Sequence, residues 1–232
     1  MNVRRLDVDP SIPARVPGYR IVTIAAVGLH PPDEGRLQRR VDELLGVGRG
    51  FLPAGEAPLR EVPALRAWSG AYRAVGLDDR SYPPSILALA RRLRNGSVPT
   101  VLPLVDLYNA HALAAMVAIG ADDADRVAFP MAVRPSAGGE PSPSIGGTTG
   151  VTEPGEIVLA DEARILCRRW VWRQSAETAL GEATKSAVLT VSTAGEADVE
   201  AAADALASDL SSLFGARVDR LPIATGSGGR AE

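Results

Sequence analysis

Apolar residues recur at helical spacing in five segments of the chain. The segment with the clearest start and stop signals begins at Ser85 after two prolines. It carries an apolar stripe from Ile86 to Leu93 and stops at Asn95-Gly96. The five predicted helices run from Asp33 to Leu45 with a stop at Gly46, through Leu65 and Tyr72 to a stop at Gly76, from Ser85 to Arg94, onward from Asp106, and onward from the capping-box spacing of Thr193 and Glu196.

Shorter apolar runs bounded by glycine, proline and serine predict strands, which dominate after Val127. The expected strands cover residues 19–29, 127–134, 156–160, 164–171 and 187–192, with an extended piece at 98–105. Because helices and strands follow one another in mixed order, we expect an α+β fold with a largely antiparallel sheet. We expect a polar arm at residues 1–17, one domain at residues 18–223 and a loose tail at residues 224–232.

Composition narrows the class of protein. Hydrophobic residues make up 46% of the 232 residues, which is typical of a globular protein, and no apolar run approaches the roughly 20 residues of a membrane helix. Because the stretch Met1 to Pro10 has no apolar run, we expect no secretory signal, and the single cysteine excludes an internal disulfide and suits the reducing cytoplasm. Two histidines and one thiol do not favour a zinc site, so we expect neither a metal nor a cofactor.

The formal net charge of −3 limits nucleic-acid partners. A protein that binds DNA or RNA through bulk charge is basic. We therefore expect no DNA partner, and any contact with RNA must come from a local patch of modest strength.

Four segments in a fixed order carry a resemblance that none of them carries alone. They are Ser85 to Arg92 followed by Asn95-Gly96, Leu104 to Asn109 with the pattern Val-Asp-x-x-Asn, Ile119 to Asp123, and Gly155 to Glu162 followed by Cys167 to Arg173 and Thr184-Lys185. The set resembles the B3/B4 domain, the aminoacyl-ester editing module of the phenylalanyl-tRNA synthetase β subunit, and matches its free-standing members best. The resemblance covers roughly residues 60–192 and implies a pocket that inspects an amino acid carried on tRNA.

Two departures from the family pattern leave the chemistry open. Synthetase domains carry a histidine after the signature, where this chain reads Ile119 to Asp122, and His111 lies too close to Asn109 to replace it. They also have a glycine-rich turn where this chain has the run from Arg168 to Arg173. A shared pocket can therefore hold a different ligand or carry out a different reaction.

The signature segment supplies the first candidate site residues. Asp106 is expected either to cap its helix or to contact the substrate. The amide of Asn109 both donates and accepts hydrogen bonds, so it can hold an α-amino group or an ester carbonyl, or serve as a structural amide. His111 is either a satisfied structural residue or a group that activates water near neutral pH.

Three further candidates follow the signature. Asp122 belongs to a cluster with Asp123 and Asp125 that is either a solvated turn or a site for the ammonium group of a substrate. Thr184 is a candidate, beside Asn109 and Asp122, for holding the amino acid or the water. Lys185 is expected at the solvated surface or against the 3′ end of tRNA.

Arginine and tryptophan are concentrated in residues 168–173. If these residues form a strand, Arg168, Trp170 and Trp172 share one face. That face can stack on bases, with Arg168 and Arg173 beside the RNA. Alternatively, the tryptophans belong to the core and the arginines pair with acidic residues.

Two functions remain open at this point. One is hydrolysis of mischarged aminoacyl-tRNA in trans, because an activated ester needs a held water and oxyanion donors rather than a strong base. The other is a non-catalytic module that holds tRNA, an amino acid or an amino-acid derivative. The absent synthetase histidine favours the second function.

Overall fold

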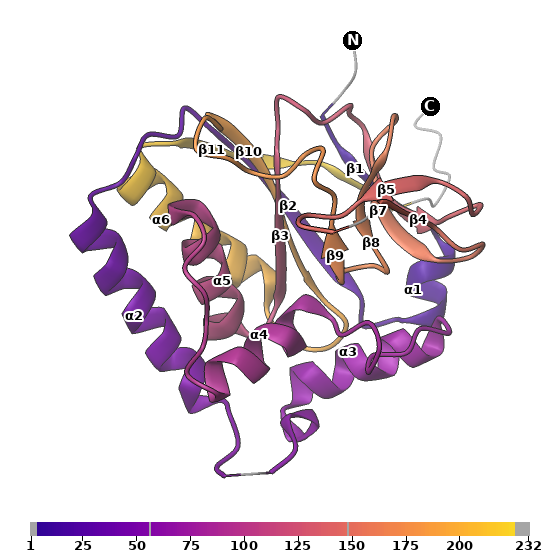
Figure 1. Ribbon diagram of the computed structural model, residues 1–232, viewed down its shortest axis with the longest axis horizontal. Helices are drawn as coiled ribbons and strands as arrows, with labels where there is room; N and C mark the ends of the chain where they lie inside the picture. Colours follow the sequence, from indigo (N-terminus) through magenta and orange to yellow (C-terminus); the bar gives the residue numbers. More distant parts are fainter. Residues whose placement is uncertain (1–3, 56, 148, 226–232) are drawn as a thin grey trace, which may run out of the picture.

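The computed structural model describes residues 4–55, 57–147 and 149–225 (Figure 1). Its elements in chain order are β1 (Leu6–Val8), α1 (Ser11–Arg15), β2 (Arg20–Val27), α2 (Glu34–Gly50), a 3-10 turn (Leu59–Glu61), α3 (Pro63–Ala74), α4 (Ser85–Arg94), α5 (Pro103–Ala115), β3 (Ala118–Asp123), β4 (Met131–Pro135), β5 (Pro141–Pro143), β6 (Thr149–Val151), β7 (Ile157–Ala160), β8 (Ile165–Arg168), β9 (Arg173–Gln174), β10 (Ser186–Thr193), α6 (Val199–Phe214), β11 (Arg217–Leu221) and β12 (Ile223–Thr225).

These strands form two main sheets and one small hairpin. The first sheet has the order β12-β1-β4-β7-β8-β9, the second has the order β11-β2-β10-β3, and β5 pairs with β6. Within the described residues, β1 is parallel to β4 and β12, and the other strand pairs are antiparallel. The expected α+β class with mostly antiparallel pairing is confirmed, but the strands form two main sheets where one sheet was expected.

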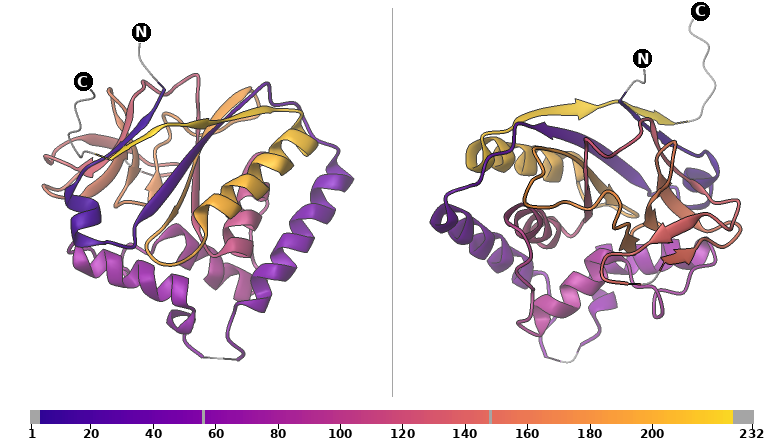
Figure 2. Two further views of the ribbon diagram at one scale, coloured as in Figure 1. Left: turned by 180° about the vertical axis from the view of Figure 1, so that it is seen from behind. Right: turned by 45° about the horizontal axis from the view of Figure 1, so that its top comes forward.

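Helices α2, α5 and α6 lie together on one side of the second sheet (Figures 1 and 2). Helix α2 continues past its expected stop at Gly46 because it packs closely on α5. A Cβ atom at Gly48 would lie 3.1 Å from Cβ of Leu113, so glycine permits the approach of the two helices. This packing offsets the low helix propensity of glycine, which costs about 1 kcal/mol per residue.

The N-terminal residues belong to the folded unit. β1 lies between β4 and β12, and Leu6 and Ile12 are fully buried. The alternation in this strand covers only three residues, which is too short for a periodicity argument. The expectation of a separate arm over residues 1–17 therefore fails for residues 6–16, while residues 1–3 lie outside the described part.

The C-terminal end also differs from its expectation. Ala224 and Thr225 belong to β12, so the loose tail expected over residues 224–232 is strand at its first two positions. Residues 226–232 lie outside the described residues. Across the part of the chain that the structure covers, no helix combines the length and apolar character needed to span a membrane.

Two helices begin at positions other than those expected. Asp198 rather than Thr193 caps α6, and its carboxylate accepts the backbone N–H groups of Glu200 and Ala201 at 3.1 and 3.0 Å. Helix α5 begins at Pro103, which suits the first turn because proline lacks an N–H group. Asp106 therefore lies inside the first turn of α5 and is not its cap.

Candidate functional site

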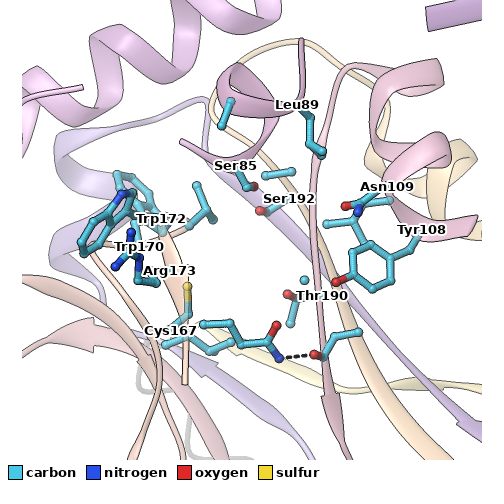
Figure 3. A pocket seen from close by; sticks show the side chains of 18 of the residues that line it. Ser85, Leu89, Tyr108, Asn109, Cys167, Trp170, Trp172, Arg173, Thr190 and Ser192 are labelled. Carbon is cyan, nitrogen blue, oxygen red and sulfur yellow. Dashed lines mark hydrogen bonds between the residues drawn. The ribbon is translucent and has the colours of Figure 1, made fainter. Parts of the chain in front are cut away.

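A pocket of about 370 Å³ lies where the two sheets meet α4 and α5 (Figure 3). Its walls come from α4, α5, β3, β10 and the segment from β8 to β9. The lining residues with polar atoms in their side chains are Ser85, Arg92, Tyr108, Asn109, Asp122, Cys167, Trp170, Trp172, Arg173, Gln174, Thr190 and Ser192. The volume lies at the small end of the range for ligand pockets.

Small and hydroxyl-bearing side chains form the floor of the pocket. Gly120 pairs with Thr190 and Ala118 pairs with Ser192 across β3 and β10, so these residues face the same side of the sheet. Gly120 has no side chain to fill the space beside Thr190, whose hydroxyl would lie 3.6 Å from a Cβ atom there. Neither hydroxyl has a hydrogen-bond partner among the described residues, so both are available to a ligand.

Tyr108 and Asn109 project into the pocket from α5 (Figure 3). The Asn109 side chain makes no hydrogen bond to any residue that the structure describes. Burial raises the pKa of Tyr108 well above its ordinary value, so the phenol stays protonated. This wall offers a ligand one amide and one hydroxyl group.

Asp122 is a buried carboxylate on the pocket wall, at the end of a strand rather than in the solvated turn that we considered. Its Oδ1 atom accepts hydrogen bonds from Thr178 Oγ1 at 2.7 Å and from Gln174 Nε2 at 3.0 Å. Burial raises the pKa of Asp122 to about 6, against the lowering effect of these two bonds. The carboxylate is therefore mostly ionised at neutral pH.

The chain turns within residues 168–173 instead of continuing as one strand. β8 ends at Arg168, and Arg169 and Trp170 have φ values of +46° and +68°. Arg168 is 8% exposed and donates two hydrogen bonds to Glu156, at 2.9 and 2.7 Å. Arg168, Trp170 and Trp172 therefore do not share one strand face, and Arg168 follows the alternative interpretation, because its guanidinium pairs with an acidic residue inside the protein.

Trp170 belongs to the core. It is 2% exposed, its ring lies edge-on to Tyr19 and Trp68 at 4.9 and 5.4 Å, and it stacks on Tyr72 at 6.3 Å. The Tyr72 hydroxyl donates to the carbonyl oxygen of Arg169 at 2.6 Å and so holds the turn in place. Trp170 is therefore not accessible for stacking on a base.

Trp172, Arg173 and Arg92 lie at the mouth of the pocket. Trp172 packs edge-on against Tyr82 at 5.0 Å, and the guanidinium carbon of Arg173 lies 4.6 Å from the centre of the Trp172 ring. Arg92 and Arg173 are exposed, and neither forms an ion pair with a described residue. The mouth is therefore positively charged although the whole chain is mildly acidic.

Cys167 lines the pocket, and a cysteine side chain can act as a nucleophile when its thiol is ionised. Burial raises the pKa of its thiol to about 12, so the sulfur is protonated at neutral pH and is a poor nucleophile. Among the described residues, no group of three or more His, Cys, Asp or Glu side chains is arranged to hold a metal ion.

Asp106 and His111 lie outside the pocket lining. The Asp106 carboxylate accepts the backbone N–H of Val101 at 2.8 Å. His111 is 3% exposed, and its Nε2 atom lies 2.8 Å from the Asp209 carboxylate, which also accepts a bond from Arg40 at 2.7 Å. Burial lowers the pKa of His111. Both residues tie structural elements together and do not face the candidate ligand.

Thr184 and Lys185 line a different hollow of about 380 Å³, formed with Leu29, Leu102 and Phe214. The Thr184 hydroxyl donates to Asp123 at 2.9 Å and accepts the backbone N–H of Gly181 at 3.0 Å. Lys185 is exposed. Of the three catalytic candidates, the structure brings Asn109 and Asp122 to one pocket and places Thr184 elsewhere.

Several residues of the pocket were not among the candidates predicted from the sequence, including Ser85, Tyr108, Gly120, Gln174, Thr190 and Ser192. Thr190 and Ser192 gave a usable signal, because they are polar positions two apart in an otherwise apolar strand. Gln174 gave none, because its place depends on β9 of one sheet approaching β3 of the other.

Comparisons with known proteins place this geometry in a family. The solved structures include an N-terminal fragment of the phenylalanyl-tRNA synthetase β-subunit from Pyrococcus horikoshii, which matches with a TM-score of 0.54 and 13% identity over 97% of this chain. The match covers 54% of that fragment, so this chain spans about half its length, and the likeness concerns the fold. No curated protein matches significantly. The B3/4 domain matches residues 67–224, more than half of the 232 residues, and the chain therefore belongs to the B3/4 domain family.

Proposed function

We propose that this chain hydrolyses the ester of mischarged aminoacyl-tRNA in trans, with the aminoacyl group held in the pocket. The observation that carries the proposal is a small pocket in which the Asn109 amide and the hydroxyl groups of Thr190 and Ser192 lack partners among the described residues. Such groups recognise a polar ligand, because a buried polar group is costly unless it is paired. The similar solved fragment comes from a phenylalanyl-tRNA synthetase β-subunit, which supports tRNA as the carrier of the amino acid.

In the proposed reaction, the oxygen of a water molecule adds to the ester carbonyl carbon. The bond from that carbon to the ribose oxygen then breaks, the ribose oxygen takes a proton, and free amino acid and tRNA leave. We assign Asn109 to the substrate carbonyl oxygen, where its N–H group can stabilise the developing negative charge. Asp122 contacts the charged part of the amino acid, and Thr184 has no part because it lines the other hollow.

The positive mouth fits the RNA end of the substrate. Arg92 and Arg173 are exposed and unpaired within the described part, so their guanidinium groups are available to phosphates. Trp172, beside Arg173, offers part of its ring for stacking. Arg168 and Trp170 are committed to the protein interior, and Lys185 lies at the second hollow, so none of these three is assigned to the RNA contact.

Hydrolysis is tested by incubating the chain with a panel of correctly charged and mischarged tRNAs and following loss of the labelled amino acid. We expect faster release than in buffer for one class of mischarged tRNA, and little effect on its correctly charged counterpart. Release at the buffer rate for every charged tRNA would overturn the proposal.

Binding without hydrolysis is the second candidate function. Neither His30 nor His111 lines the pocket, and the Cys167 thiol is protonated because burial raises its pKa to about 12. Among its described residues, the pocket therefore offers neither a histidine base nor an ionised cysteine to attack the ester. If this function is correct, the chain binds charged tRNA in the same panel and leaves the ester intact.

A further inference from the structure

The side chain of Gln174 is held in one orientation by two acceptors. Its Nε2 atom donates to the carbonyl oxygen of Ala121 and to Oδ1 of Asp122, the latter at 3.0 Å. A backbone carbonyl and an ionised carboxylate can only accept, so the amide must present its nitrogen to both. The Oε1 atom of Gln174 therefore points away from them, and no described residue donates to it.

Asp122 likewise has an acceptor atom to which no described residue donates a hydrogen bond. Its Oδ1 atom takes the bonds from Gln174 and Thr178, while no described residue donates to its Oδ2 atom. Asp122 forms no ion pair with any residue in the described part. Both Asp122 and Gln174 line the pocket, so together they offer a ligand one carbonyl-type oxygen and one negative charge.

We infer that Asp122 and Gln174 form a binding site for a primary ammonium group, so that the pocket accepts aminoacyl groups with a free α-amine and rejects N-acylated ones. An ammonium group carries three donors, no acceptor and one positive charge, which matches this pair. A water molecule supplies donors without the charge that a buried carboxylate needs. This inference rests on the proposed function, which makes tRNA the carrier of the aminoacyl group.

Charge at the mouth orients the same ligand. Arg92 and Arg173 repel an ammonium group and attract phosphate, whereas Asp122 attracts the ammonium group further inside. An aminoacyl group on the phosphate-bearing end of tRNA has this separation of charges. Acylation of the amine removes the positive charge and two of its donors and adds bulk beside Asp122.

Gln174 also has a structural role, because its bonds to Ala121 and Asp122 join the two sheets. The test must therefore separate ligand recognition from folding. Gln174→Met removes the amide at nearly constant side-chain length, and Asp122→Asn removes the charge at constant shape. Gln38→Met is the matched control, because Gln38 is exposed on α2 and bonds only to Asp42, at 2.9 Å.

The experiment measures binding of non-hydrolysable 3′-aminoacylamido-3′-deoxyadenosines by calorimetry. The probes carry alanine, serine, leucine or phenylalanine, each with a free amine and as its N-acetyl derivative. For the probes that bind, we expect the free amine to bind tighter by on the order of tenfold or more, the scale of hydrogen bonds to a charged group. The preference should fall to within about twofold in Gln174→Met and Asp122→Asn and persist in Gln38→Met.

Each result decides between distinct conclusions. Equal or tighter binding of the N-acetyl probes overturns the ammonium site and leaves the proposed hydrolysis standing. A full free-amine preference in both Gln174→Met and Asp122→Asn also overturns it. Binding of no probe overturns the ammonium site and removes support for the aminoacyl pocket. A free-amine preference without any hydrolysis of charged tRNA overturns only the proposed reaction.

Discussion

Two buried carboxylates near the pocket lie in opposite electrostatic environments. Glu156 accepts two hydrogen bonds from Arg168, and although burial alone would raise the pKa of Glu156, these bonds bring it below its ordinary value. Asp122 forms no ion pair with a described residue, and burial raises its pKa to about 6. The carboxylate at the turn of residues 168–170 thus has a cationic partner within the protein, whereas the carboxylate in the pocket has none among the described residues.

The two tryptophans of the same segment differ in the same way. Both tryptophans line the pocket, but Trp170 packs among three aromatic rings and is 2% exposed, whereas Trp172 is partly exposed beside Arg173. Residues of one type, two positions apart, therefore serve the fold in one case and the site in the other. The difference teaches that the partner of a residue, more than its type, identifies a functional group.

The largest expected effect comes from removing the cation that pairs with the Glu156 carboxylate. Arg168→Met leaves Glu156 buried without its cation, which should lower the free energy of unfolding by about 3–5 kcal/mol. The matched change Arg173→Met, at an exposed position, should alter it by less than about 0.5 kcal/mol. Urea unfolding of both variants measures the difference. Equal, small losses would contradict a structural role for Arg168.

The pocket carboxylate should make stability depend on pH with the opposite sign to a paired carboxylate. The pKa of Asp122 is about 6 in the folded chain and about 3.9 when unfolded, so the folded chain holds an extra proton between these values. Stability from this group therefore falls as pH rises through that window. Relative to wild type, Asp122→Asn should gain on the order of 2–3 kcal/mol between about pH 4 and pH 7.

Urea unfolding at a series of pH values tests this sign. Asp125→Asn is the matched control, because Asp125 is exposed and lies three residues further along the chain. A wild-type minus Asp122→Asn difference that stays flat with pH would show that Asp122 is not a buried carboxylate without a cation.

The smallest expected effect concerns the positive mouth. Arg92→Gln and Arg173→Gln should each weaken binding of tRNA and lower the slope of log K against log salt concentration by about 0.7, the value for one phosphate contact on a single strand. Arg39→Gln, exposed on α2 away from the pocket lining, should leave the slope unchanged. Filter binding at several salt concentrations measures the slopes. Equal slopes in all three variants would remove Arg92 and Arg173 from the RNA contact.

The sequence predicts a helix well where its start and stop residues agree with the spacing of its apolar residues. Helix α4 has prolines before it and Asn95-Gly96 after it, and the structure places it from Ser85 to Arg94 as expected. The largely antiparallel α+β class also followed from element order. The Val-Asp-x-x-Asn signature led to Asn109, which lines the pocket.

Features that depend on distant partners could not be predicted in this way. The turn at Arg169 and Trp170 is fixed by Glu156 and Tyr72, which lie far from it in sequence. The role of Gln174 depends on two sheets meeting. A strand pattern records which face a residue takes, but not what the opposing element provides.

The most direct test of the central claim is the deacylation rate of Asn109→Ala on the charged tRNA that wild type hydrolyses best. The Asn109 amide has no partner among the described residues, so its loss should cost little stability and slow deacylation by on the order of tenfold or more, the scale of one hydrogen bond to a reacting group. Asn95→Ala, at an exposed position after α4, should keep the wild-type rate. An unchanged rate per folded molecule in Asn109→Ala would contradict the assignment of this pocket as the site of ester hydrolysis.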